Sequence, residues 1–160
     1  MPLDDMERRI ERLEDIEAIK RLKARYCAYC DDNYNAEGIA SLFTEDGVWD
    51  GEPRGVNHGR EAIRQFFSRG HQRVPFAVHM VMNPMIEVEG EKAHGTWYLF
   101  QAVTEGGQAT STGSGQAKWV SGRYEEDYVK VKGRWFIKKL WVRFNFWTPY
   151  EKGWVKERWG

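Results

Sequence analysis

The second half of the chain holds four long strand-like segments in succession, and this run most restricts the fold. Gly90, the Gly106–Gly115 loop and Lys132-Gly133 separate the segments at the spacing of antiparallel hairpins. The 106–115 loop, GGQATSTGSG, has the most flexible composition in the chain. The predicted strands are residues 76–83 with an extension to 88, 92–104, 116–131 and 134–148.

The first half of the chain is predominantly helical. Residues 4–31 form a predicted long helix, because Ile16, Ile19, Leu22 and Tyr26 recur at spacings of three and four. Shorter elements follow: a helix at 36–43 with Asn35 as its N-cap, a turn at 44–47, a strand at 48–50, a loop at 55–59, and a helix at 60–68 stopped by Gly70.

Helices followed by a meander of antiparallel strands predict an α+β fold. The expected architecture is a curved, mixed or antiparallel sheet wrapped around the long helix, enclosing a cone-shaped pocket. The length of 160 residues suits one domain spanning 1–160. The tail, 150–160, carries Trp154 and Trp159 and is expected to pack on the cavity mouth or on a neighbouring subunit.

Composition excludes some functional classes. Lysine plus arginine and aspartate plus glutamate both number 24, so the net charge is zero, which argues against a general nucleic-acid binder. The chain shows no signal peptide and no apolar run long enough to span a membrane, so a cytoplasmic protein is expected, without membrane association. The 23 aromatic residues (8 Trp, 7 Tyr and 8 Phe) favour a lined pocket or a large subunit interface.

The two cysteines, Cys27 and Cys30, form a CxxC at the end of the long helix. A thioredoxin-like motif would start a helix after a strand, and a zinc site would need two more ligands at suitable spacing. Buried, reduced thiols are therefore expected. There is also no phosphate-cradling glycine loop, HExxH or GxSxG in the sequence, and no plausible metal cluster.

His79 lies in the first long strand, in PFAVHMVMNP. Alternation places Phe76, Val78 and Met80 on one face and His79 on the other, and because both faces are apolar, the strand is predicted to be buried on both sides. A histidine there is either a core residue tied by one hydrogen bond or a general base.

Two acidic residues end the long helix, Asp31 and Asp32, and they belong either to a solvated turn or to a His–Asp pair. Tyr26 and Asp31 are five residues apart, about 140° around an ideal helix. They converge on one site only if the helix ends near Cys30.

Arg143 lies in the apolar last strand, LWVRFNFW, so it needs a partner anion or a wet pocket. It is either half of a structural ion pair or a clamp for a substrate oxyanion. Further candidates for lining a pocket are Gln101, Trp97, Tyr124 and Trp49.

A set of motifs in fixed order resembles a known family. DIEAIKRLKARYCAYCD, a lone strand histidine, GTWYLFQ and YEEDYVKVKGRWFIKKLWVRF together resemble the SnoaL-like branch of the nuclear transport factor 2-like superfamily, over roughly residues 6–147. Within that branch the chain is most similar to the bile acid 7α-dehydratase group. It is more distantly similar to the scytalone dehydratase and hexachlorocyclohexane dehydrochlorinase groups.

The resemblance implies a cone-shaped α+β barrel without metal or cofactor, and a homo-oligomer, with a trimer favoured over a dimer. It also implies that His79, Asp31 and Tyr26 are catalytic and that Arg143 binds substrate. Gln101 stands where the bile acid enzymes have an acidic residue, so the substrate is expected to differ.

These expectations predict a cofactor-independent lyase of the dehydratase type, acting on a small hydrophobic cyclic substrate. Two alternatives remain open at this point. One is an isomerase or cyclase that uses the same residues. The other is a non-catalytic subunit or binding module, such as the β subunit of ring-hydroxylating dioxygenases.

Overall fold

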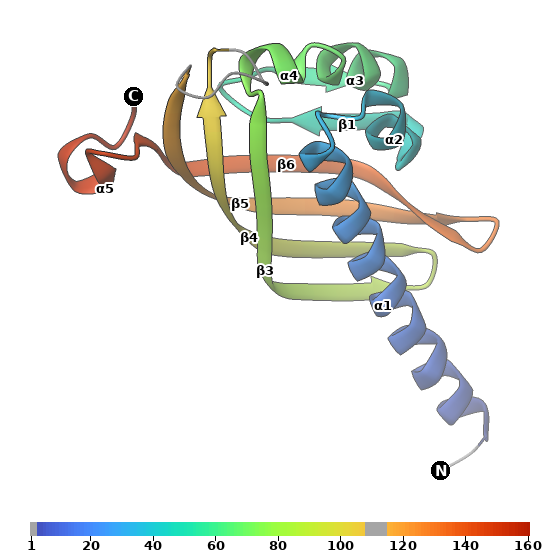
Figure 1. Ribbon diagram of the computed structural model, residues 1–160. Helices are drawn as coiled ribbons and strands as arrows, with labels where there is room; N and C mark the ends of the chain where they lie inside the picture. Colours follow the sequence, from blue (N-terminus) through green and yellow to red (C-terminus); the bar gives the residue numbers. More distant parts are fainter. Residues whose placement is uncertain (1–2, 108–114) are drawn as a thin grey trace.

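The computed structural model describes residues 3–107 and 115–160 and has the predicted α+β architecture, with one long helix packed on one face of a six-stranded sheet (Figure 1). Most of the predicted 106–115 loop, residues 108–114, lies outside the described residues. The helices are α1 (Leu3–Asp31), α2 (Ala36–Ser41), α3 (Arg60–Phe67), α4 (Gly70–Arg73) and α5 (Gly153–Lys156). The strands are β1 (Phe43–Asp50), β2 (Val56–His58), β3 (Phe76–Glu89), β4 (Lys92–Glu105), β5 (Gln116–Val131) and β6 (Arg134–Pro149).

The sheet is mixed and open. Its strand order is β2-β1-β6-β5-β4-β3, in which only the β1–β6 pair is parallel. Because β2 and β3 form its two edges, the sheet does not close into the barrel that the family resemblance implies.

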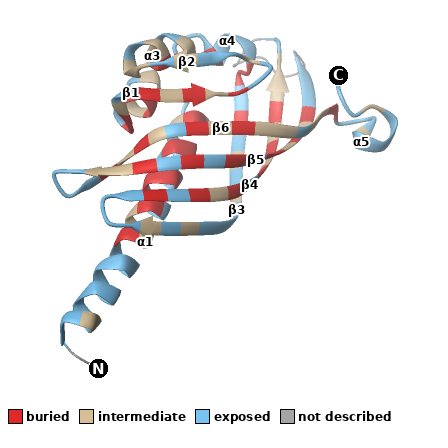
Figure 2. Cartoon of the chain, turned by 180° about the vertical axis from the view of Figure 1, so that it is seen from behind, coloured by how far each residue is buried: buried red, intermediate tan, exposed pale blue. Residues whose placement is uncertain are grey.

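Helix α1 is buried only along its second half. Ile19, Leu22 and Tyr26 face the sheet and are almost fully buried, as their spacing predicts. The first turns project beyond the sheet into solvent, as Figures 1 and 2 show. The C-terminal half of α1 is therefore the part that can contribute to an enclosed site.

The four long strands match their predicted boundaries to within one or two residues. As predicted, Asn35 caps α2, because its side chain accepts a hydrogen bond from the backbone amide of Gly38 at 2.9 Å. The differences lie in the short elements. β1 includes the residues predicted as a turn at 44–47, with an irregular register between Phe43 and Val48. β2 replaces a predicted loop, and Gly70 begins α4 instead of ending a helix.

Bulges bend the sheet. The β3–β4 register shifts between Met82 and Met85, where Asn83 adopts a left-handed φ of 51°. The β5–β6 register shifts between Ser121 and Gly122. Such irregularities increase local twist and bend, and the strands curve sharply in Figure 1. The curvature produces the concave face on which α1 and the pocket lie.

One prediction for β3 is wrong. Its outward face is not buried, because Phe76, Val78, Met80 and Met82 are 53%, 39%, 41% and 43% exposed. The physical reason is topological: β3 is an edge strand, and helix α1 packs only against the face that carries His79.

The tail folds back onto the end of β6. Trp159 forms a parallel bridge with Trp147, whose amide donates to the carbonyl of Arg158 at 3.0 Å. The carbonyl of Trp147 accepts a hydrogen bond from the amide of Gly160 at 3.0 Å.

The helices within the described residues include none with the length and apolar character that crossing a membrane requires.

Candidate active site

An aromatic pocket lies between the C-terminal end of α1, helices α3 and α4, and the concave face of the sheet. It has about 530 Å³ of empty volume, part of which is open to solvent. Most of its wall is apolar, which suits a hydrophobic ligand. The aromatic side chains that line it are Tyr26, Tyr34, Trp49, Phe66, Phe67, Tyr124, Phe144 and Trp147.

His79 lies on the pocket wall and is held by Asp31. The Nδ1 atom of His79 is 2.6 Å from a carboxylate oxygen of Asp31, and the side chain of His79 is only 5% exposed. The same carboxylate accepts the backbone N–H of His79, at 3.0 and 3.1 Å. A carboxylate partner requires Nδ1 to carry a proton, so in the neutral ring Nε2 has the free lone pair.

The position at which α1 ends differs from the one expected from the sequence. The helix continues through Asp31, one residue beyond the expected break at Cys30. It then ends in a turn in which Asn33 and Tyr34 have left-handed φ values of 50° and 53°. Asp31 needs no unwinding to reach His79, because β3 runs beside this end of the helix.

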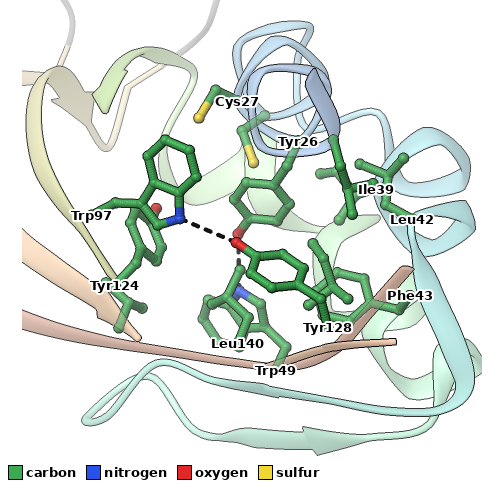
Figure 3. Close-up of a cluster of buried hydrophobic side chains, with 14 of the residues drawn as sticks. Tyr26, Cys27, Ile39, Leu42, Phe43, Trp49, Trp97, Tyr124, Tyr128 and Leu140 are labelled. Carbon is green, nitrogen blue, oxygen red and sulfur yellow. Dashed lines mark hydrogen bonds between the residues drawn. The ribbon is translucent and has the colours of Figure 1, made fainter. Parts of the chain in front are cut away.

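Tyr26 also projects from α1 toward the pocket, from a different direction than Asp31. Its hydroxyl accepts a hydrogen bond from the indole N–H of Trp49 at 3.0 Å, as Figure 3 shows. Burial raises the pKa of Tyr26 well above its ordinary value, and the nearby thiol of Cys30 adds to the shift. The phenol therefore stays protonated and able to donate a hydrogen bond at physiological pH.

Gln101 and Tyr124 also line the pocket. Gln101 is the direct partner of His79 across the β3–β4 ladder and is 4% exposed. Tyr124 has the ammonium group of Lys23 3.2 Å from its ring centroid, on the core side. The structure thus brings His79, Asp31, Tyr26, Gln101, Tyr124 and Trp49 together at one site.

Two of the predicted site residues do not lie there, and Trp97 is the first. Its indole N–H donates to the hydroxyl of Tyr128 at 3.1 Å (Figure 3). Tyr128 donates in turn to Glu126, which pairs with Lys23. Trp97 is therefore part of a buried polar chain beneath the pocket instead of a wall residue.

Arg143 is the second. Its guanidinium pairs with Glu52 at 3.0 Å and lies 3.6 Å from a carboxylate oxygen of Asp50, with the ring centroid of Trp141 3.8 Å away. Strand alternation explains the placement, because Val142 and Phe144 line the pocket and Arg143 faces the other side of β6. The structural ion pair that the sequence left open as an alternative is what the contacts show.

Sequence reasoning missed several polar or aromatic residues of the pocket wall, namely Arg54, Arg73, Trp147, Tyr34, Phe66, Phe67 and Phe144. Arg54 and Arg73 lie in short connecting segments, where no periodic pattern indicates which way a side chain points. Trp147 faces the pocket because the β5–β6 bulge changes the alternation beyond Phe144. Simple alternation would place Phe146 on the same face as Phe144, but Phe146 instead stacks on Trp154 outside the pocket.

The two cysteines are free and buried, as predicted. Burial raises the pKa of Cys27 to about 11 and that of Cys30 well above its ordinary value. Both therefore stay as unreactive thiols at neutral pH. Within the described part of the chain, no three His, Cys, Asp or Glu side chains converge in a way that could hold a metal ion.

Several solved structures of differently named proteins have the same fold as this chain. A hexachlorocyclohexane dehydrochlorinase (LinA type 2) superposes with a TM-score of 0.78 at 21% identity, over 88% of this chain and 91% of that one. The type 3 enzyme of Novosphingobium barchaimii LL02 gives 0.76 at 22% identity, over 88% and 92%. A candidate scytalone dehydratase of Novosphingobium aromaticivorans gives 0.74 at 24% identity, over 87% and 89%.

The SnoaL-like domain family matches residues 11–140, which include most of α1, His79 and most of the sheet. The closer likeness to the bile acid 7α-dehydratase group stays a prediction from the sequence. The family match confirms the broader resemblance, and the chain belongs to the SnoaL-like domain family.

Proposed function

We propose that this chain is a cofactor-independent lyase that catalyses a dehydratase-type elimination on a hydrophobic cyclic substrate, steroid-like or polycyclic. One observation carries the proposal: the 2.6 Å contact between Asp31 and Nδ1 of a buried histidine on the wall of an aromatic pocket. The names of the similar structures, dehydrochlorinase and dehydratase, also describe eliminations.

His79 acts as the general base. Its Nε2 takes a proton from a carbon next to a carbonyl or an extended unsaturated group, and the electron pair of that C–H bond moves into the substrate as an enolate. The enolate then expels the hydroxyl group from the neighbouring carbon, forming a double bond. The imidazolium returns its proton to the departing hydroxyl, so the products are an alkene and water and the enzyme is unchanged.

Asp31 holds the imidazole in the tautomer that leaves Nε2 free, and its charge stabilises the imidazolium that forms. Tyr26 donates a hydrogen bond to the enolate oxygen, since its phenol stays protonated. Gln101, directly opposite His79, orients the substrate through its amide, which cannot exchange protons. Arg143 has no part in this mechanism because it lies on the other face of β6.

The test compares His79→Ala and Asp31→Asn with wild type on a panel of hydroxylated steroid and polycyclic ketones, with products identified by mass spectrometry. Removing the base or its orienting carboxylate is expected to lower the rate about 10²–10⁴-fold, because general base catalysis contributes a factor of that size. Circular dichroism would establish that both variants fold.

The chain offers a matched control in a second His–Asp pair. His94 Nδ1 lies 2.9 Å from Asp127, but both side chains are about half exposed, on the opposite side of the sheet from the pocket. His94→Ala and Asp127→Asn should retain wild-type rates. Wild-type rates in His79→Ala would contradict the proposal, and a product with the same mass as the substrate would indicate an isomerase.

A further inference from the structure

Two arginines face the pocket from the segments that sequence reasoning passed over. Arg54 lies in the loop between β1 and β2, and Arg73 is the last residue of α4. Both line the same pocket as His79. The proposed mechanism uses neither of them, so their presence on an otherwise aromatic wall needs a separate physical reason.

Arg54 lies over an aromatic ring and is only weakly paired with a carboxylate. Its guanidinium carbon lies 3.8 Å from the ring centroid of Trp147, and its side chain is 21% exposed. Its one carboxylate within 4 Å among the described residues is Glu105, at 3.6 Å, which is too long for a hydrogen bond. The other oxygen of Glu105 is occupied by Lys118 and by the indole N–H of Trp147.

Arg73 lacks a carboxylate partner among the described residues, and its guanidinium carbon lies 5.0 Å from the ring centroid of Phe66. It is also close enough to Arg54 for the two charges to repel. Burial lowers the pKa of Arg54, and the charge of Arg73 lowers it further, while Glu105 opposes both effects.

The charges around this part of the pocket do not balance. Among the described residues, Arg54, Arg73 and Lys118 bring three positive charges to this region, where Glu105 contacts Arg54 and Lys118, and Lys118 also donates to the backbone oxygen of Gly160. Asp31, the other nearby carboxylate, is engaged by His79. Arg54 is partly buried beside the exposed Arg73, and an anion placed between the two guanidinium groups would relieve their repulsion.

We propose that Arg54 and Arg73 bind a carboxylate of the substrate, whose apolar cyclic body lies against the aromatic wall within reach of His79. A guanidinium matches a carboxylate with two parallel N–H donors, and its stacking on Trp147 pre-organises it to do so. This inference deepens the lyase proposal and rests on it for the role of His79. Anion binding can nevertheless be measured without turnover.

Isothermal titration calorimetry with 2-naphthoate and 2-naphthamide tests the proposal, because the two probes share shape and differ in charge. Wild type should bind the acid at least tenfold more tightly than the amide. Arg54→Met and Arg73→Met should each weaken binding of the acid about tenfold to a hundredfold, the range expected for a lost charge-assisted hydrogen bond. Neither should change amide binding more than about threefold.

Arg134→Met is the matched control, because Arg134 is exposed and stacks on Phe136 at 5.3 Å, on the far hairpin. It should bind 2-naphthoate like wild type. Arg54→Lys keeps the charge and guards against misfolding of Arg54→Met, and it should retain part of the preference for the acid. Thermal unfolding would establish that each variant is folded.

Equal affinity for acid and amide, no binding of 2-naphthoate at millimolar concentration, or the same loss in Arg134→Met would overturn the carboxylate site. His79→Ala separates this inference from the lyase proposal, since it should lose activity and still prefer the acid. If His79→Ala is inactive but the protein does not prefer the acid over the amide, only the carboxylate site is contradicted. If the preference for the acid is present but His79→Ala is fully active, only the lyase proposal is contradicted.

Discussion

Lys23 and Glu126 form an ion pair whose side chains are completely buried between α1 and β5. The second oxygen of Glu126 accepts from Tyr128, which itself accepts from the indole of Trp97. On the other side, the ammonium of Lys23 lies 3.2 Å from the ring centroid of Tyr124, a pocket residue. The charge is compensated on every side, so the pair supports the pocket floor without leaving an unpaired buried group.

Removing one member of the pair should therefore be severe. Lys23→Met leaves the carboxylate of Glu126 buried without its cation, and we expect the free energy of unfolding to fall by about 3–5 kcal/mol in urea denaturation. The double variant Lys23→Met/Glu126→Gln should recover much of this loss, because a neutral pair no longer buries a charge. Lys20→Met is the control on the same helix, since Lys20 is exposed. A Lys23→Met protein as stable as Lys20→Met would contradict the interpretation.

At the scale of elements, β3 contributes to two different surfaces, the pocket wall and the exposed outer face of the sheet. Its inward face carries His79 to the pocket, and its outward face exposes four apolar side chains, Phe76, Val78, Met80 and Met82. It is also a sheet edge, which favours pairing with another chain. The protein has no net charge, so two copies would not repel one another at long range. We propose that a second copy of the chain covers this face in a homo-oligomer, for which the family resemblance favours a trimer.

A charge on that face should then separate the subunits. Met80→Lys would place an ammonium group in the proposed interface and raise the dissociation constant at least tenfold, since it would have to be desolvated on assembly. Light scattering coupled to size-exclusion chromatography measures the change in mass. Val131→Lys is the control, because Val131 is 45% exposed at the distal hairpin. A wild-type protein that stays monomeric at high concentration would rule out the interface.

For the molecule as a whole, the core depends on phenols and thiols that stay neutral. Burial raises the pKa of six such groups, because a charged form would be poorly solvated in the apolar interior. In the unfolded chain these groups ionise at ordinary values, near pH 8.5 for cysteine and near 10 for tyrosine. The residues concerned are Tyr26, Cys27, Cys30, Tyr34, Tyr124 and Tyr128.

The protein should consequently lose stability in alkali. A raised folded-state pKa contributes stability that is fully present below the unfolded value and is lost as the pH rises through the folded value. We expect the free energy of unfolding to begin falling near pH 9, by about 1.4 kcal/mol per pH unit for each group that ionises only in the unfolded chain. Urea denaturation at pH 7, 9 and 10 measures this. Cys27→Ala should reduce the decline that begins near pH 9, and a constant stability from pH 7 to 10 would contradict the prediction.

The sequence by itself determined the long helix, the four long strands and the class of the fold. The period of Ile19, Leu22 and Tyr26 predicted the buried face of α1. The glycine-containing turns predicted the boundaries of the long strands, and alternation predicted the face of His79. These inferences succeeded because helix and strand periods are local properties of the backbone, so a hydrophobic pattern reports them directly. The motifs that resemble the SnoaL-like family then brought Asp31 and His79 together as candidates, and they are in contact.

Only the tertiary structure decided which faces meet and where the polar groups of the pocket lie. The bulge in β6 turned Trp147 inward, and the loop after β1 placed Glu52 beside Arg143 on the outer face of β6. Short connections placed Arg54 and Arg73 on the pocket wall. No local pattern contains this information, because the direction of a loop side chain and the position of a bulge depend on packing between segments that are far apart in the chain.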